Sequence, residues 1–200
     1  SAELGAVFDI VERVISYSCM LLVIVTIPLH FAVIAVLNHE RRRAAGQSVF
    51  YRIYIIGGLI DVTALLNNYF GSIFPANGWL LGYYLSSPTT GKVYLMIAWA
   101  TRYGQATTVT LLAINRLTAL LLPTRHSHLW NPTRILIANT AQILPGTLLG
   151  LGLCVTPVFW YQEQDTGGWY IQSAPSVPSF RSSLHFAVFQ SLILFLLFMN

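Results

Sequence analysis

Residues 14–37 read VISYSCMLLVIVTIPLHFAVIAVL, a predominantly apolar stretch without Asp, Glu, Lys or Arg. A helix needs about 20 such residues to cross roughly 30 Å of membrane hydrocarbon. This stretch meets that length, and it is too long for the apolar core of a cleavable signal peptide. It therefore predicts a helix that crosses a bilayer.

The same criterion finds further apolar stretches, which run over about 51–74, 93–122, 135–159 and 184–199. These runs are too long and too uniformly apolar for the alternating strands of a membrane β-barrel. In lipid a helix satisfies its own backbone hydrogen bonds. We therefore predict one all-α transmembrane domain over residues 1–200. The chain begins with Ser and ends within an apolar run, so we expect a truncated multi-pass bundle.

The composition agrees with this fold class. Hydrophobic residues make up 55% of the chain and charged residues 9%, and the mean hydropathy is +0.62. Soluble domains carry about a quarter charged residues, so this chain cannot cover a water-facing surface. The net charge is +4, but the arginines lie in short clusters between apolar runs. That arrangement is typical of membrane orientation and not of nucleic-acid binding.

No GxSxG, HExxH or phosphate-binding loop motif occurs in the sequence. These motifs place a nucleophile, a zinc ion or a nucleotide. We therefore expect no enzymatic activity, no metal and no cofactor.

Arginines gather in two of the short connections between predicted helices. Arg41, Arg42 and Arg43 follow the first helix, and Arg125 and Arg134 follow the third. Short loops rich in Lys and Arg stay in the cytoplasm. We therefore expect the N-terminus outside and the odd-numbered helices running inward. Residues 162–183, rich in Gly, Ser, Pro and Gln, are then predicted as an irregular outer loop.

Two charged residues fall deep inside predicted helices. Asp61 and Arg102 each lie about 15 Å from a helix start, on antiparallel helices. Gln105 and Asn68 share a helical face with Arg102 and Asp61, respectively. Charges inside a membrane are costly unless they are paired. We therefore expect Asp61 and Arg102 to pair or to face one polar cavity. A ligand pocket or switch and a salt bridge that only fixes packing remain open as interpretations.

The third predicted helix ends with NRLTALLLP over residues 115–123. It is similar to the acidic-Arg-Tyr motif of rhodopsin-type G-protein-coupled receptors, in which an arginine closes the third helix. The simpler alternative is that Arg116 is a juxtamembrane arginine that only follows the positive-inside rule. FYRI at 50–53, LAINRLTA at 112–119, Pro123 and LW at 129–130 more specifically resemble the nematode serpentine chemoreceptors of the gamma superfamily. These include class gamma and its close relatives such as class V.

This resemblance implies a seven-helix chemosensory receptor of which the chain covers the first five helices. Such a receptor binds a small chemical cue outside and couples to a heterotrimeric G protein inside. It implies an integral protein of the plasma membrane, with the sensory cilium as a specific location. Asn115, Arg116 and Pro123 would lie at the G-protein end, and Asp61 near the position of an acidic group that binds sodium in rhodopsin-type receptors.

The chain also departs from the rhodopsin pattern. Asn115 stands where the acidic residue is expected. The only cysteines, Cys19 and Cys154, lie inside apolar runs, so the usual disulfide between the third helix and the second outer loop cannot form. A transporter or channel fragment with a substrate path along Asp61 and Arg102 is the alternative from another functional class, although no internal repeat is visible.

Overall fold

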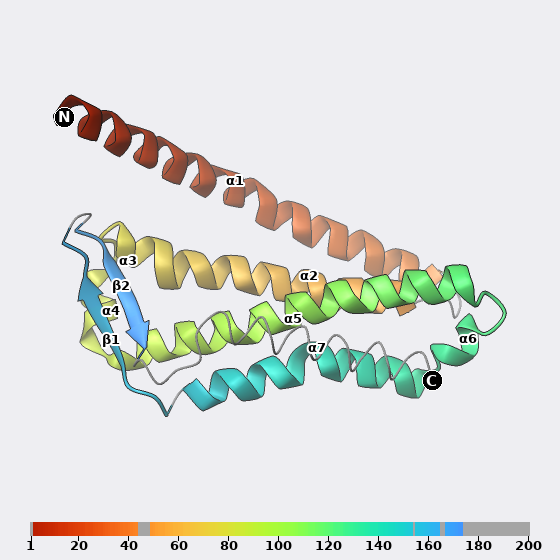
Figure 1. Cartoon of the computed structure of the whole chain (residues 1–200). Coiled ribbons are helices and arrows are strands. Elements are labelled where there is room, and N and C mark those ends of the chain that lie inside the picture. Colours follow the sequence, from red (N-terminus) through yellow and green to blue (C-terminus); the bar gives the residue numbers. More distant parts are fainter. Residues whose placement is uncertain (1, 44–48, 154, 165–166, 174–200) are drawn as a thin grey trace.

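The computed structural model describes residues 2–43, 49–153, 155–164 and 167–173. Long helices form most of this part (Figure 1): α1 (Ala2–Arg43), α2 (Val49–Asn68), α5 (Pro88–Leu121) and α7 (Pro132–Leu153). Short elements connect them: the π-helical turn η1 (Tyr69–Ile73), α3 (Phe74–Ala76), α4 (Leu81–Ser86) and α6 (His126–Leu129). The strands β1 (Val158–Gln162) and β2 (Trp169–Ser173) form an antiparallel hairpin.

Within the described residues, three segments are long and apolar enough to cross a membrane: Met20–Arg43, Val49–Ala76 and Pro132–Gly152. The predicted multi-pass helical bundle is thereby confirmed. The predicted fifth helix, 184–199, and Cys154 lie outside the described residues.

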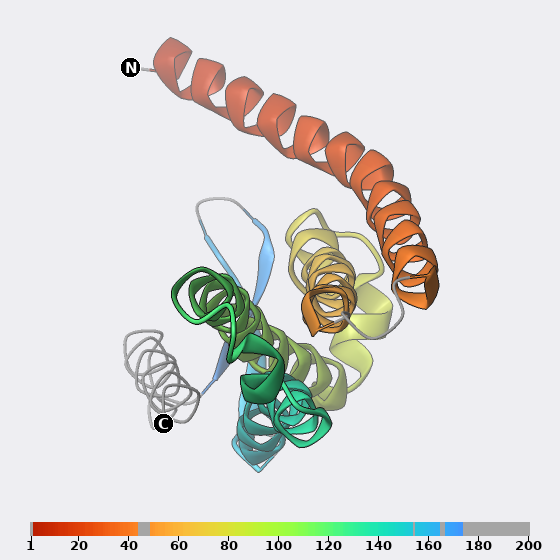
Figure 2. The same cartoon turned by 90° about the vertical axis from the view of Figure 1, so that its right-hand side faces the viewer.

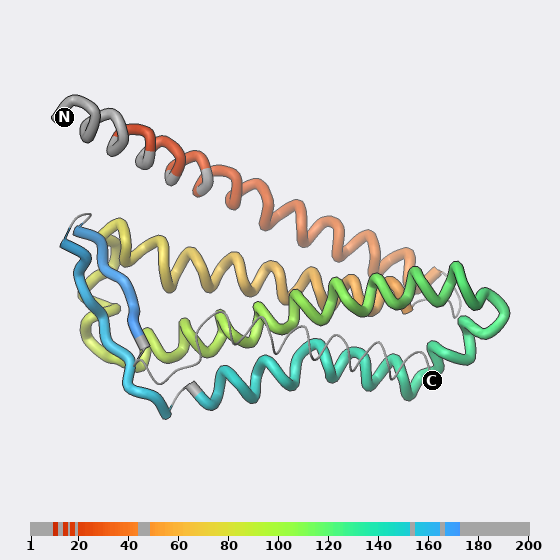
Figure 3. Tube along the Cα trace, in the orientation of Figure 1, coloured from red at the N-terminus to blue at the C-terminus, as the bar shows by residue number. Residues whose placement is uncertain are grey.

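Helix α5 is long enough to span but is not among these apolar segments. It carries most of the buried polar side chains of the described residues: Thr101, Thr107, Thr108, Asn115 and Thr118. In Figure 2 and in the trace of Figure 3, α5 lies beside both α2 and α7, whereas α1 stands on the far side of α2. The least apolar long helix of the bundle is therefore the central one, which faces protein more than lipid.

Glycines let α7 approach α5 closely. A Cβ added at Gly146 would lie 2.6 Å from the backbone oxygen of Ala100, and one at Gly150 would lie 2.5 Å from that of Met96. Small residues allow helix backbones to meet in this way in membranes. Gln142 of α7 then reaches across the interface, where its Nε2 donates to Thr108 Oγ1 over 2.8 Å and to the Ile53 backbone oxygen over 3.3 Å.

The hydrophobic core lies toward the end of the bundle that carries α6. Its buried members come from α2, α5, α7 and the residue after α6: Ile53, Leu111, Ile114, Trp130, Ile135 and Ala138. This core fixes the arginine-rich end of the bundle.

The helix bounds differ from the predicted ones at several places; α1, for example, runs over Ala2–Arg43 and not only over 14–37. Helix α5 begins at Pro88 and not near Val93, because Ser87 Oγ accepts a hydrogen bond from the Thr89 backbone N–H and a proline at the first helical position lacks only an N–H that would have no partner. The helix predicted over 135–159 ends at Leu153.

Strand β1 replaces the last part of that predicted helix. Strand β2 corrects the prediction of an irregular loop over 162–183 at Trp169–Ser173, while residues 165–166 and 174–183 of that loop lie outside the described residues. Pro157 cannot continue a helix, and Val158 pairs with Ser173 at the open end of the hairpin. Gly167 adopts a positive φ of 68° in the turn, a conformation that glycine adopts without steric cost.

Candidate functional site

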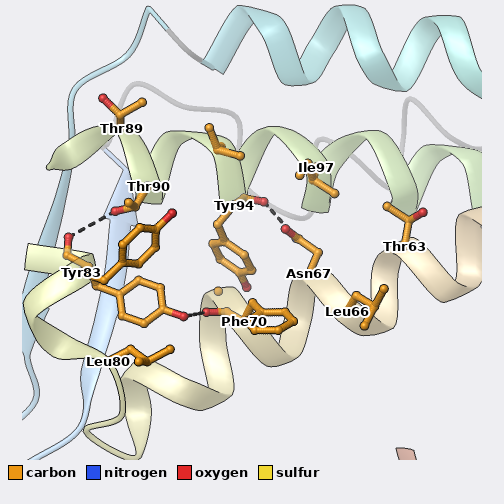
Figure 4. A pocket seen from close by; sticks show the side chains of 13 residues that line it. Thr63, Leu66, Asn67, Phe70, Leu80, Tyr83, Thr89, Thr90, Tyr94 and Ile97 are labelled. Atoms are coloured by element: carbon orange, nitrogen blue, oxygen red, sulfur yellow. Dashed lines mark hydrogen bonds between the residues drawn. The ribbon is translucent and has the colours of Figure 1, made fainter. Parts of the chain in front are cut away.

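A cavity of about 770 Å³ opens at the hairpin end of the bundle, between the end of α2, η1, α4 and the start of α5 (Figure 4). Its lining residues are Thr63, Leu66, Asn67, Phe70, Gly71, Leu80, Tyr83, Tyr84, Thr89, Thr90, Val93, Tyr94 and Ile97. Ligand pockets in proteins usually measure about 300–1,000 Å³ and are mostly apolar. The cavity therefore has the size and lining of a small-molecule site.

Close packing between η1 and α5 shapes one wall. The ring of Tyr94 lies against Gly71 so closely that any Cβ there would overlap it. One turn earlier in α2, Asn67 Nδ2 donates to the Tyr94 backbone oxygen over 3.0 Å. These two contacts fix the Tyr94 ring at the cavity.

Helix α4 supplies the opposite wall. Leu80 adopts a left-handed φ of 58° before α4 begins, and the Tyr84 hydroxyl donates to the Phe70 backbone oxygen. Thr90 Oγ1 donates to the backbone oxygen of Ser87 over 2.8 Å. Burial, with a smaller contribution from Tyr83, raises the pKa of Tyr84 above its ordinary value of 10.0, so this phenol stays uncharged at physiological pH.

The hairpin covers the outer side of this wall. The rings of Tyr84 and Trp160 lie 5.4 Å apart between their centroids. On β2, Ile171 Cδ1 occupies the space above Gly91 at the start of α5, only 2.0 Å from where a Cβ would stand. The ring contact and this close packing thus join the hairpin to α4 and to the start of α5.

The polar residues predicted from sequence lie on α2 and α5. Gln105 Nε2 donates to Asp61 Oδ1 over 2.8 Å, so two of the four predicted residues are joined. Arg102 and Asn68 have exposed side chains. None of the four lines the cavity, whereas Asn67, the neighbour of Asn68, does.

At the opposite end of the bundle, Asn115 is buried and Arg116, directly after it, is exposed. The ring Nε2 of His126 in α6 lies 3.2 Å from Asn115 Oδ1. Three residues along α5, Thr118 Oγ1 accepts a hydrogen bond from Trp130 Nε1 over 2.9 Å. These two contacts hold the connection between α5 and α7 against the end of α5, while Pro123 is exposed within it.

A comparison of the chain with models of known protein families identifies its family. The family model described as Serpentine type 7TM GPCR chemoreceptor Srv matches residues 19–200. The chain belongs to this serpentine chemoreceptor family. None of the curated proteins compared matches the chain.

Membership of the serpentine family confirms the resemblance drawn from the segments at 50–53 and 112–130. It makes the chain an integral membrane protein of a chemosensory receptor family. Members of this family are receptors and not enzymes as a rule. Within the described residues, the hairpin follows α7, and α5 is the third of the four long helices.

Sequence reasoning missed three residues of this serpentine receptor that the structure places at contacts between elements. They are Asn67 at the cavity, His126 beside Asn115, and Gln142 between α2, α5 and α7. Gln142 is a polar residue inside an apolar run, and such residues face the interior of a membrane bundle. That signal could have found Gln142. No signal of this kind separates Asn67 from Asn68.

Proposed function

We propose that the chain is a chemosensory receptor that binds a small molecule in the cavity at the hairpin end and couples to a heterotrimeric G protein at the arginine-rich end. The cavity carries this proposal, because it is an apolar recess of ligand size in a member of a chemoreceptor family.

The distribution of positive charge supports the direction of signalling. Arg41, Arg42 and Arg43 close α1, and Arg116 and Arg125 lie where α5 ends. The ends of α1 and α5 that carry these arginines lie opposite the hairpin (Figure 1). The positive-inside rule puts this end in the cytoplasm. The cavity then faces outward, in a plasma membrane that includes the sensory cilium.

Asn115, Arg116 and Pro123 form the proposed G-protein contact. Arg116 and Pro123 are exposed at the cytoplasmic end, and Asn115 contacts α6 through His126. Asp61 and Gln105, with Arg102 and Asn68 on the same two helices, form the proposed polar element between the two ends.

A reporter-cell assay tests this function. The protein is expressed with each class of Gα subunit, and a panel of small uncharged and charged organic compounds is applied. We expect a ligand-dependent signal that Val93→Phe abolishes by filling the cavity. The matched control is Val109→Phe, on the same helix but exposed and away from the cavity.

Arg116→Gln should weaken coupling and leave ligand binding unchanged, whereas Arg52→Gln, an exposed arginine at the same end, should change neither. Ligand-driven uptake or current without any G-protein response would contradict the receptor function and favour the transporter or channel alternative.

A further inference from the structure

We propose that the cavity takes an uncharged, largely apolar molecule with an aromatic or similarly flat body and a single hydrogen-bond acceptor that meets the Tyr83 or the Tyr94 hydroxyl. This inference rests on the proposed function in one respect, that the cavity is the ligand site. It adds the chemical class of the ligand.

The lining provides apolar surface from several sides. Leu66 and Phe70 come from α2 and η1, Leu80 precedes α4, and Val93 and Ile97 come from α5. Figure 4 shows the rings of Phe70, Tyr83 and Tyr94 gathered around the same space. Aromatic rings stack on flat apolar partners with offset or edge contacts. The cavity therefore fits a flat apolar body better than a hydrated polar one.

Most polar side chains of the lining already bind the protein itself. Thr63 Oγ1 donates to the Leu59 backbone oxygen over 2.8 Å, and Asn67, Tyr84 and Thr90 also donate to backbone oxygens. A donor that is committed in this way would have to break a hydrogen bond to serve a ligand. These four residues therefore define the shape of the cavity more than they form hydrogen bonds with polar groups of a ligand.

Two phenol hydroxyls, together with the side-chain hydroxyl of Thr89, remain for a ligand. Within the described part of the chain, the hydroxyls of Tyr83 and Tyr94 have no hydrogen-bond partner, and both residues line the cavity. A phenol O–H at physiological pH is a good donor. A carbonyl or ether oxygen on an otherwise apolar molecule is the group that such donors recognise.

The lining also excludes ions. None of the lining residues is Asp, Glu, Lys, Arg or His. Lys92 precedes Val93 and Asp61 precedes Thr63 by two residues, but neither lines the cavity, and Asp61 accepts from Gln105. Burying a charge without an opposite partner is strongly unfavourable. An ammonium or carboxylate ligand would find no counter-charge among these residues.

Three matched probes test the inference on the purified chain in lipid nanodiscs. Benzophenone is uncharged, aromatic, carries one carbonyl acceptor and labels C–H bonds at its binding site on irradiation. 4-Benzoylbenzoate adds a carboxylate to the same framework. Diphenylmethane keeps the two rings but lacks the acceptor, and it is measured by competition with benzophenone labelling. Labelled peptides are located by mass spectrometry.

We expect saturable benzophenone labelling of cavity residues, at least tenfold weaker labelling by 4-benzoylbenzoate, and loss of labelling in Val93→Phe but not in Val109→Phe. The double variant Tyr83→Phe and Tyr94→Phe should weaken benzophenone binding about fivefold, as expected for the loss of a hydrogen bond, and leave diphenylmethane unchanged. Tyr54→Phe, an exposed tyrosine outside the cavity, is the control.

Equal labelling of the cavity by 4-benzoylbenzoate overturns the inference and leaves the proposed function standing. So does a double tyrosine variant that weakens both uncharged probes alike. Labelling spread over lipid-facing helices and unaffected by Val93→Phe also overturns it. If Val93→Phe leaves the reporter-cell response intact as well, the proposed function fails at the same cavity.

Discussion

The ring of His126 in α6 lies with its Nε2 3.2 Å from Oδ1 of the buried Asn115 in α5. An arginine motif that normally begins with a carboxylate begins here with an amide, and the neighbouring connection supplies a partner for that amide. The contact joins the end of the central helix to the segment that a G protein would approach.

Removing this contact should raise ligand-independent signalling. A hydrogen bond of this kind contributes about 1 kcal/mol, so His126→Phe should increase basal G-protein activation up to about fivefold by releasing α6 from α5. The measurement is basal reporter activity at matched surface expression. His128→Phe is the matched control, because His128 lies on the same short helix with an exposed side chain. Equal effects of the two variants would show that the Asn115 contact does not restrain the receptor.

Asp61 and Gln105 should be energetically coupled. Hydrogen bonds to charged groups contribute about 1.5–3 kcal/mol. The variants Asp61→Asn, Gln105→Leu and their combination are unfolded in denaturing detergent, and we expect the double variant to lose less stability than the two single losses added together.

The same cycle with Arg102→Gln in place of Gln105→Leu tests the charge pairing expected from the sequence. Non-additive losses support a pairing of Asp61 with Arg102 or a shared cavity. Additive losses would leave Gln105 as the residue that Asp61 depends on.

Gly146 should tolerate no side chain. A Cβ at this position meets the backbone oxygen of Ala100, which cannot move aside as a flexible side chain would. Gly146→Ala should therefore destabilise the bundle by about 1–3 kcal/mol, measured as a fall in thermal stability. Gly152→Ala, on the same helix with open space around it, should be neutral or slightly stabilising. A neutral Gly146→Ala would mean that α7 does not approach α5 this closely.

Gly91 should hold the hairpin in place. Gly91→Val would displace Ile171 from its position at the start of α5, and backbone hydrogen exchange in Val158–Gln162 should rise severalfold. Because the obstacle is the end of a side chain, adding Ile171→Ala should restore slow exchange. Gly82→Val, where nothing lies within 4 Å of an added Cβ, should leave the hairpin unchanged. Faster exchange that persists in the Gly91→Val and Ile171→Ala double variant would contradict this packing.

The apolar runs were sufficient to predict a multi-pass bundle, because a bilayer restricts spanning segments to a few structures. They were less informative where the chain leaves the membrane. Pro157 is a signal for a helix stop, and the pair Gly167 and Gly168 is a signal for a hairpin turn, yet the long apolar run over 135–159 hid the helix stop.

The site was predicted only in part, for a geometric reason. Asp61 on α2 accepts a hydrogen bond from Gln105 on α5, but helical spacing alone could not say how α2 and α5 cross. At the end of α2 the side toward α5 carries Asn67 and not Asn68. Crossing angles depend on how side chains of both helices fit together, and one helix alone does not contain that information.

The polar character of α5 also has a consequence for biosynthesis. Insertion from the translocon into lipid depends on the apolarity of each segment as it emerges, and α5 is less apolar than the helices on either side of it. We therefore expect α5 to insert while it packs against α2, which is synthesised before it. Helix α7, which is synthesised later, then packs against its other side. The central helix of the bundle is thus less able to insert into the membrane alone than its two neighbours, and misfolding during membrane insertion should begin at α5.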